Sequence, residues 1–191
     1  MFLKDLRSTF TQIESLPIPC IASVSSVALG GGLELALCAH IRVFADTTIV
    51  GLPETRLAII PGAGATYRLP LAIGRARALD LILSGRRIGS KLSYNWGLCT
   101  HVAITQGESP SPVQWPKPDE TSRQLTLLKS IDVAFDICQG GPLAVRAAIQ
   151  ALAGGNEAAE NDAYDSILQT EDRVEALTAF GEKRTPKFAG R

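Results

Sequence analysis

Three consecutive glycines constrain this chain more than any other feature. Gly30, Gly31 and Gly32 separate the apolar run "CIASVSSVAL", which suits a buried strand, from the helix-like run "LELALCAH". Glycines at such a junction permit a sharp turn and a close approach of the backbone to a ligand, and they leave free N–H groups where the helix starts. Residues 41–45, "IRVFA", have the apolar pattern of a parallel strand. The sequence therefore predicts a β-α-β unit over residues 20–45.

A carboxylate lies just inside the apolar helix that the glycines begin. Burial of an ionised carboxylate is expensive unless something compensates the charge, so Glu34 needs a reason. A second acid, Glu54, lies in another stretch rich in glycine and proline, "GLPETRLAIIPGAG". Two carboxylates in a partly apolar cleft would have coupled titrations, so that one holds a proton while the other is ionised. The residues alone leave a surface ion pair of Glu54 with Arg56 or Arg68 equally open.

The glycine run has three interpretations. Phosphate binding is weakly supported, because "GGGLEL" lacks the third glycine of GxGxxG and the chain has no P-loop lysine. Close packing of strand and helix explains the glycines but leaves Glu34 unexplained. An acyl-group site uses both features, because a glycine N–H stabilises the oxygen of a thioester enolate while carboxylates handle a proton or a water.

Composition excludes several classes of function. Nineteen basic and nineteen acidic residues give no net charge, so no global field favours nucleic acid or an anionic membrane. The two histidines and four cysteines show no metal-ligand spacing, and we expect no metal site. No apolar run approaches the roughly 20 residues of a membrane-spanning helix. We therefore expect neither a membrane partner nor a bound metal.

Patterning along the chain predicts three regions. The N-terminal residues interleave charged with apolar side chains at helical spacing, which indicates a helix ending near Ser15 and no targeting signal. Residues 1–104 read as an α/β core, with a clear helix near residues 75–83. Residues 105–120 contain four prolines and form the best boundary. Residues 121–191 read as helices, two of them near residues 156–168 and 171–183.

Three motifs in order resemble one family. "ALGGGLELALCAHIRVFA", "LPETRLAIIPGAGATYRLPLAIG" and "TEDRVEALTAFGEKRTPKF" are similar to segments of the enoyl-CoA hydratase/isomerase (crotonase) superfamily, and most similar to its 3-methylglutaconyl-CoA hydratase-like branch. The resemblance implies an α/β fold with a crotonase-type β-β-α spiral core and a helical C-terminal region that covers the active site and forms trimers. It also implies a homotrimer or hexamer that acts in the metabolism of fatty acids or branched-chain amino acids.

The resemblance implies a lyase that adds water, with syn geometry, across the double bond of a 2-enoyl-CoA thioester. Gly31 resembles the second oxyanion-hole donor of the family, and Glu34 and Glu54 resemble the catalytic pair that holds the water. Which glutamate is the acid stays open. Coenzyme A is part of the substrate, so no separate cofactor is expected. The positions that resemble substrate-binding residues are Gly30, Leu57, Pro61, Gly62, Phe180 and Lys183.

Complete members of the superfamily carry several dozen residues before the point that corresponds to Met1. Those residues include a "CAGAD"-type loop that donates the first oxyanion-hole N–H and the opening strands of the sheet. We therefore expect this chain to lack the N-terminal part of the spiral, with a loss of about 10²–10³ in turnover. Relatives act in mitochondria or peroxisomes, and the resemblance implies one of these compartments.

Two other functions stay open. One is RNA binding, since some relatives in this branch bind AU-rich RNA and a basic cluster is opposed only by Asp80. A solvated helix face with trimer contacts is the favoured explanation of the cluster, because only Tyr67 offers an aromatic platform. The other is a non-catalytic subunit in an oligomer of related chains. The cations of the basic cluster are Arg68, Arg75, Arg77, Arg86, Arg87 and Lys91.

Overall fold

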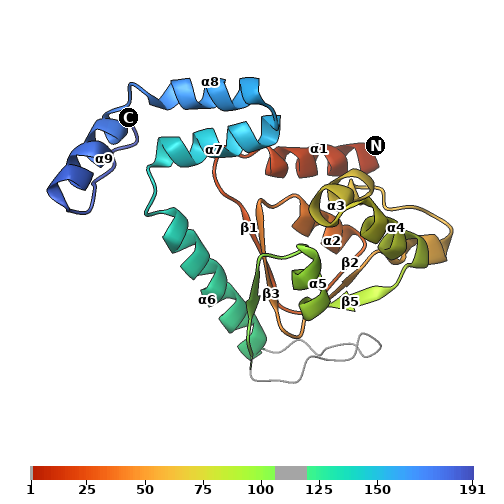
Figure 1. The fold of residues 1–191 in the computed structure, drawn as a ribbon. Coiled ribbons are helices and arrows are strands. Elements are labelled where there is room, and N and C mark those ends of the chain that lie inside the picture. The colour runs from red at the N-terminus through yellow and green to blue at the C-terminus, as the bar shows by residue number, and fades with distance from the viewer. Residues whose placement is uncertain (1, 106–119) are drawn as a thin grey trace. The chain divides into compact units, whose positions relative to one another are not determined.

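The structure is a computed structural model that describes residues 2–105 and 120–191 (Figure 1). The chain divides into two compact units. The first contains the described residues up to 16 and from 20 to 132, and the second contains residues 17–19 and 133–191. The proline-rich boundary predicted at residues 105–120 lies almost wholly outside the described residues.

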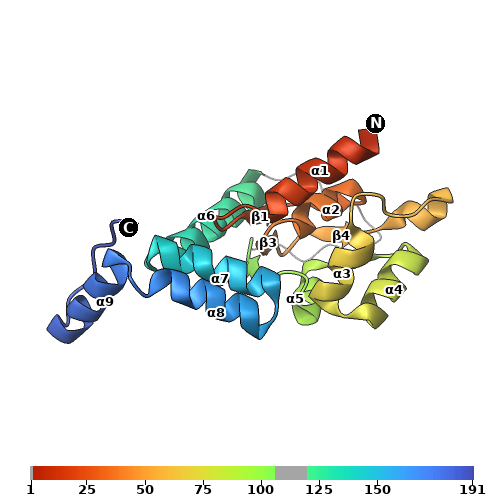
Figure 2. The ribbon, with the colours of Figure 1, turned by 90° about the horizontal axis from the view of Figure 1, so that it is seen from above.

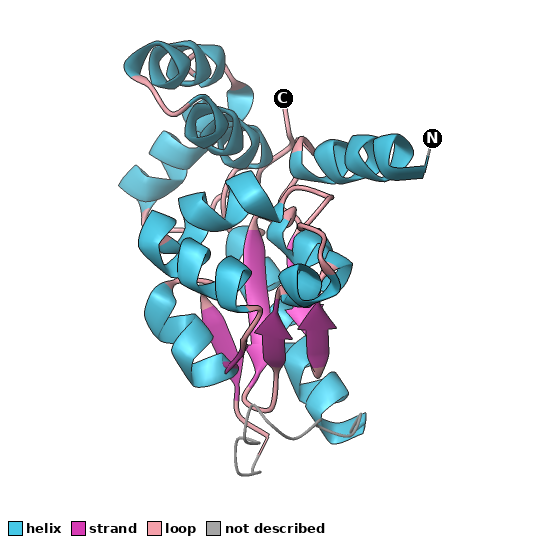
Figure 3. Ribbon diagram, turned by 90° about the vertical axis from the view of Figure 1, so that its right-hand side faces the viewer, coloured by secondary structure: helices cyan, strands magenta, loops and turns pink. Residues whose placement is uncertain are grey.

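Pairs of short strands followed by helices build the first unit. Its strands form two sheets, with the orders β1-β3-β6 and β2-β4-β5. All pairings are parallel except that of β4 with β5. Each turn of the chain gives one strand to each sheet, which confirms the predicted α/β arrangement of a β-β-α spiral. Figure 3 shows the strands in magenta among the helices. The strands are β1 (Ile21–Val24), β2 (Val27–Leu29), β3 (Ile41–Ala45), β4 (Ile49–Gly51), β5 (Arg87–Gly89) and β6 (His101–Ala103).

The single strand predicted from "CIASVSSVAL" is wrong, because this segment forms two strands in different sheets. Strand β1 pairs with β3, whereas β2 pairs with β4. The hydroxyl of Thr48 donates to the carbonyl of Val24 at 2.6 Å, and the N–H of Ile49 donates to Ser26 at 3.0 Å. These contacts come from a later part of the chain, so the local apolar pattern does not reveal where the segment changes sheets.

Helices enclose an apolar core between them and the strands. Helix α2 (Gly31–Leu37) follows the glycine turn, and β1, α2 and β3 form the predicted β-α-β unit. Helices α3 (Ala65–Ile73) and α4 (Arg75–Ser84) lie side by side in Figures 1 and 2. The unit also contains the 3₁₀ helix η1 (Pro53–Leu57) and helix α5 (Ser90–Trp96). Fully buried core side chains include Leu33, Phe44, Val50, Leu69, Leu81, Ile88 and Leu98.

Helix α1 (Phe2–Glu14) ends where the sequence predicts. Its apolar side chains at Leu6, Phe10 and Ile13 pack on Cys38 and Ala63, so the helix contacts both the end of α2 and the loop that precedes α3. This packing uses the apolar face that the spacing predicts for the helix.

The described part of the second unit is helical, as predicted. The chain passes between the two units within α6 (Glu120–Ile137). Helices α7 (Pro142–Gly154) and α8 (Glu157–Ile167) lie side by side in both views (Figures 1 and 2), and α9 (Glu171–Glu182) follows. Asn156 and Thr170 cap α8 and α9 by accepting backbone N–H groups. Within the described ranges, every helix is too short or too polar to span a bilayer.

Replacement of Gly51 by alanine tests the close approach of β4 to β5. A Cβ atom there would lie 2.7 Å from the carbonyl oxygen of Arg86. Since a backbone atom cannot move aside as a flexible side chain can, we expect Gly51→Ala to lower the free energy of unfolding by about 1–3 kcal/mol in urea titrations. Gly89→Ala in β5 is the control, because its Cβ would meet no atom within 4 Å. Equal stability of the two variants would contradict the prediction.

Candidate active site

A cavity of about 620 Å³ in the first unit contains both glutamates that the sequence singles out. Its wall is mostly apolar, and its charged side chains are those of Arg7, Glu34 and Glu54. The apolar part comes from α1 and from the segment between η1 and α3. The lining residues are Leu3, Leu6, Arg7, Glu34, Glu54, Ala58, Ile59, Ile60, Gly62 and Ala63.

Glu34 is a buried carboxylate with two backbone partners. It lies in the first turn of α2 and is only 3% exposed. Its Oε1 atom accepts the N–H of Ala63 at 2.8 Å and the N–H of Ala65 at 3.0 Å. Since α3 begins at Ala65, the positive end of that helix also lies beside the carboxylate. These donors supply the compensation that burial of Glu34 requires.

Helix η1 positions the second glutamate. Pro53 begins η1, and Glu54 follows in its first turn. The hydroxyl of Thr55 donates to the carbonyl of Ile82 at 3.1 Å, which ties η1 to α4. Arg56 donates to the carbonyl of Ser84 at 3.2 Å and so adds a second tie. Glu54 therefore projects from a short helix that is held on the side of α4.

The alternative ion pair of Glu54 with Arg56 or Arg68 does not form in the described part of the chain. Arg68 pairs instead with Glu14, with Nη2 and Oε2 2.7 Å apart. Arg56 binds the backbone of α4. Among the described residues, neither of these two arginines is thus an ion-pair partner of Glu54.

The surroundings of Glu54 favour its protonated form. Burial raises the pKa of its carboxyl group, and the negative charge on Glu34 raises it further. Its Oε2 atom is enclosed and has no hydrogen-bond partner among the described residues. The two glutamates therefore have different environments, since one accepts two N–H groups and the other lacks a partner for one oxygen.

The glycine turn borders this pair. Gly30 has a φ of +53°, and a Cβ atom on it would lie 2.9 Å from Oε1 of Glu54. Gly31 is the first residue of α2, where the N–H has no intrahelical acceptor. A Cβ atom on Gly31 would meet nothing within 4 Å, so open space lies beside it. The N–H of Gly30 donates to the carbonyl of Gly51 at 3.0 Å, which fixes the turn against β4.

The remaining residues of the predicted site fall in different places. Gly62 lines the cavity. Leu57 and Pro61 flank lining residues in the sequence without lining the cavity themselves, and Leu57 is 71% exposed. Phe180 and Lys183 belong to the second unit, where Phe180 is 84% exposed near the end of α9. Their contact with a substrate stays a prediction.

Sequence reasoning missed several contributors to the cavity. Leu3 and Leu6 reach it from α1, and Ile59 and Ile60 reach it from the segment after η1. The apolar stripe of α1 was the available signal, but it did not say what the helix covers. The N–H donors to Glu34 gave no signal, because a backbone group carries no mark in the sequence.

Several members of the basic cluster have partners within the chain. Arg68 is 4% exposed and paired with Glu14. Arg86 pairs with Asp80, and the guanidinium groups of Arg77 and Arg86 lie over the ring of Trp96, at 5.7 and 5.2 Å from its centre. These contacts give the cluster a structural role, and RNA binding stays a prediction.

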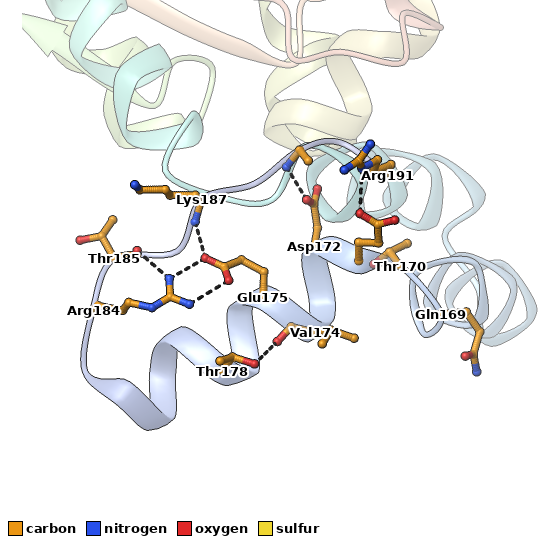
Figure 4. A pocket seen from close by; sticks show the side chains of 12 residues that line it. Gln169, Thr170, Asp172, Val174, Glu175, Thr178, Arg184, Thr185, Lys187 and Arg191 are labelled. Carbon is orange, nitrogen blue, oxygen red and sulfur yellow. Dashed lines mark hydrogen bonds and ion pairs between the residues drawn. The ribbon is translucent and has the colours of Figure 1, made fainter.

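A second pocket, of about 900 Å³, lies in the second unit where the C-terminal tail returns along α9 (Figure 4). Glu175 binds Arg184 through both carboxylate oxygens, at 2.6 and 2.9 Å, and accepts the N–H of Lys187 at 2.8 Å. Asp172 accepts the N–H groups of Ala189 and Gly190. The carboxylates of this pocket thus hold the tail in place and are not available as a catalytic pair.

Comparison with known proteins shows the family to which the chain belongs. The sequence model of the enoyl-CoA hydratase/isomerase family matches residues 1–107, more than half of the 191 residues. The chain belongs to the enoyl-CoA hydratase/isomerase family. The crystal structure of an enoyl-CoA hydratase from Bacillus anthracis is similar to this chain, with a sequence identity of 39% and a TM-score of 0.86. The match covers 99% of this chain and 69% of the Bacillus anthracis chain. The similarity confirms the crotonase-type fold.

Two curated relatives in the hydratase/isomerase family are more similar in sequence. An enoyl-CoA isomerase/hydratase of Zymoseptoria tritici is 52% identical over 100% of this chain and 61% of its own length. The mitochondrial methylglutaconyl-CoA hydratase 1 of Pyricularia oryzae is 47% identical over 100% of this chain and 56% of its own length. The chain thus spans about three fifths of the length of these relatives.

Removal of the charge on Glu34 tests its electrostatic coupling to Glu54. Glu34→Gln keeps an acceptor oxygen for Ala63 and Ala65 but removes the negative charge. We expect the pKa of Glu54 to fall part of the way toward its ordinary value of 4.5, because burial, the larger cause of the upward shift, remains. Carbon-detected NMR titration of labelled glutamate measures this change. Glu160→Gln is the control and should leave the pKa of Glu54 unchanged. An unchanged pKa of Glu54 in Glu34→Gln would show that the two carboxylates do not interact.

The tail contact in the second unit has its own pH dependence. Hydrogen bonds from Arg184 and from the N–H of Lys187 lower the pKa of Glu175 from 4.5 to about 2. Because the pKa is lowered on folding, the contact stabilises the tail fully above pH 4.5 and is lost as the pH falls toward 2. We expect the protection factor of the Lys187 amide in hydrogen exchange to fall over this range, and Glu175→Gln to abolish that pH dependence. Titration of Glu175 with a midpoint near pH 4.5 would refute this prediction.

Proposed function

We propose that this chain is an enoyl-CoA hydratase that adds water, with syn geometry, to the double bond of a 2-enoyl-CoA thioester. The observation that carries the proposal is the convergence of Glu34 and Glu54 on one mostly apolar cavity. The glycine turn beside them supports it, since the N–H of Gly31 has no intrahelical acceptor and a Cβ atom on Gly31 would meet no atom within 4 Å. Family membership supports an enoyl-CoA thioester as the class of substrate.

The chemistry requires stabilisation of charge on the thioester oxygen. As the oxygen of water bonds to the β-carbon, electron density moves to the thioester carbonyl and forms an enolate. In this proposal the N–H of Gly31 donates a hydrogen bond to that oxygen, and by analogy with known oxyanion holes one such donor contributes about 2.7–4 kcal/mol. Protonation of the α-carbon then collapses the enolate and completes the addition.

The two glutamates have separate roles in this proposal. Glu34, whose Oε1 is held by two N–H groups, takes the proton from the attacking water as a carboxylate. Glu54, whose pKa is raised by burial, gives its proton to the α-carbon. One proton enters Glu34 and one leaves Glu54, so a proton exchange with solvent restores both groups. The unpartnered Oε2 of Glu54 supports a position where a reactant completes the hydrogen bonding.

Relatives suggest the finer description of substrate and compartment. The Pyricularia oryzae relative and one from Mus musculus, 39% identical, are both mitochondrial methylglutaconyl-CoA hydratases. We therefore propose a branched 2-enoyl-CoA as the substrate and mitochondria as the compartment. The coenzyme A is part of that substrate. Apolar side chains exposed on the helices of the second unit support a trimer, and they include Phe135, Leu152, Tyr164, Leu177 and Phe180.

Loss of absorbance at the enoyl-thioester band tests the proposal, with crotonyl-CoA and 3-methylglutaconyl-CoA as substrates. We expect Glu34→Gln and Glu54→Gln each to lower kcat by about 10²–10⁴-fold, because each variant removes one proton-transfer group. Glu160→Gln, an exposed glutamate on α8, is the matched control and should retain full activity. Absence of hydration by the folded wild-type chain, or equal activity of all three variants, would refute the proposed function.

A further inference from the structure

We propose that Arg68 is a positioning residue for Glu34. Together with Arg7 and Glu14 of α1, it orients residues 62–65 so that two of their N–H groups hold the carboxylate of Glu34. The effect on turnover rests on the proposed function, whereas the orientation of the loop is independent of it.

Two carbonyl groups of the loop accept hydrogen bonds from arginines. Nη1 of Arg68 donates to the carbonyl of Ala63 at 3.0 Å. That carbonyl belongs to the peptide between the two peptides whose N–H groups bind Oε1 of Glu34. Nε of Arg7 donates to the preceding carbonyl, that of Gly62, at 2.6 Å. With both carbonyls held by arginines, the neighbouring N–H groups of Ala63 and Ala65 are directed to Glu34.

The burial of Arg68 is expensive, and its contacts offset that cost. The side chain of Arg68 is 3% exposed, and its Nε and Nη2 atoms donate to Oε2 of Glu14 at 3.0 and 2.7 Å. All three guanidinium nitrogens therefore have acceptors. An ion pair with one buried partner is weak evidence for stability, because apolar residues of similar volume often stabilise a protein as well or better. A hydrogen-bonded arginine supplies what an apolar residue cannot, a fixed direction for the Ala63 carbonyl.

Gly64 shows how closely the guanidinium lies against the loop. A Cβ atom on Gly64 would lie 2.0 Å from Nη1 of Arg68 and 2.7 Å from the hydroxyl oxygen of Tyr67. The backbone of Gly64 has a φ of +118°, a value that residues with a side chain rarely adopt. The guanidinium also lies 4.7 Å from the centre of the Tyr67 ring. A side chain at this position would therefore displace the guanidinium from its place beside the loop.

A continuous set of contacts therefore joins α1 to the candidate active site. Glu14 pairs with Arg68, and Arg68 donates to the carbonyl of Ala63. The N–H groups of Ala63 and Ala65 then donate to Glu34. A displacement of about 1 Å at a reacting group can lower turnover by about 10²-fold. Arg68 lies outside the cavity lining, so its effect on turnover comes through the loop.

The test compares Arg68→Met with Arg86→Met in the full chain. Both variants remove an arginine that pairs with one carboxylate, but Arg86 pairs with Asp80 away from the loop. We expect Arg68→Met to accelerate amide hydrogen exchange at Ala63 and Ala65 by about tenfold or more, with exchange in β3 unchanged. We also expect kcat to fall by about 10- to 100-fold with little change in KM. Arg86→Met should alter neither the exchange rates of these two amides nor kcat.

Two further variants keep the test decisive. Arg68→Lys retains the charge but has one donor nitrogen in place of three, and it should give intermediate exchange rates. If Arg68→Met does not fold, Glu14→Gln, which weakens the hold on Arg68 and leaves the cavity intact, replaces it and should accelerate the same two amides.

The exchange measurement needs no turnover, so it separates the two proposals. Unchanged exchange at Ala63 and Ala65 in folded Arg68→Met overturns the orientation of the loop by Arg68, whatever the activity of the wild-type chain. Faster exchange with unchanged kcat overturns the positioning role in catalysis. Faster exchange in a chain without hydration activity supports the orientation of the loop and refutes only the proposed function.

Discussion

The burial of one charged group, the Glu34 carboxylate, constrains much of the first unit. An ionised carboxylate at 3% exposure needs donors, and the chain supplies them as the N–H groups of Ala63 and Ala65. These donors require a loop whose backbone turns toward α2, a helix that starts at Ala65, and arginines that hold the opposite carbonyls. The glycine turn fixes the start of α2, because the N–H of Gly30 donates to the carbonyl of Gly51 and Gly31 begins the helix without an intrahelical acceptor for its own N–H.

The two glutamates show how one cavity creates two different acids. Glu34 is surrounded by donors, whereas Glu54 is enclosed near that charge and lacks a partner for Oε2 among the described residues. Burial and the nearby charge both raise the pKa of Glu54. The difference arises from the backbone around each residue, because residue type is the same. It provides a physical basis for assigning the proton donor and the base in the proposed hydration.

Local patterns predicted many of the helices. The apolar stripe gave α1, the glycines gave the start of α2, and the helical patterns near residues 156–168 and 171–183 gave α8 and α9. The change of sheet between β1 and β2 was not predictable, because it depends on contacts with Thr48 and Ile49. Arg68 was grouped with surface cations for a similar reason, since its charge is visible in the sequence but its partner Glu14, 54 positions away, is not.

The sequence by itself determined the element types, the family resemblance and the two carboxylates that needed an explanation. It did so because propensity, periodicity and glycine content act over a few neighbouring residues. Only the tertiary structure decided that both carboxylates share one cavity, that α1 supplies part of its wall, and which partners hold Glu34. Those facts depend on backbone donors and on burial. Such properties arise when distant segments meet, and no residue in the sequence encodes them alone.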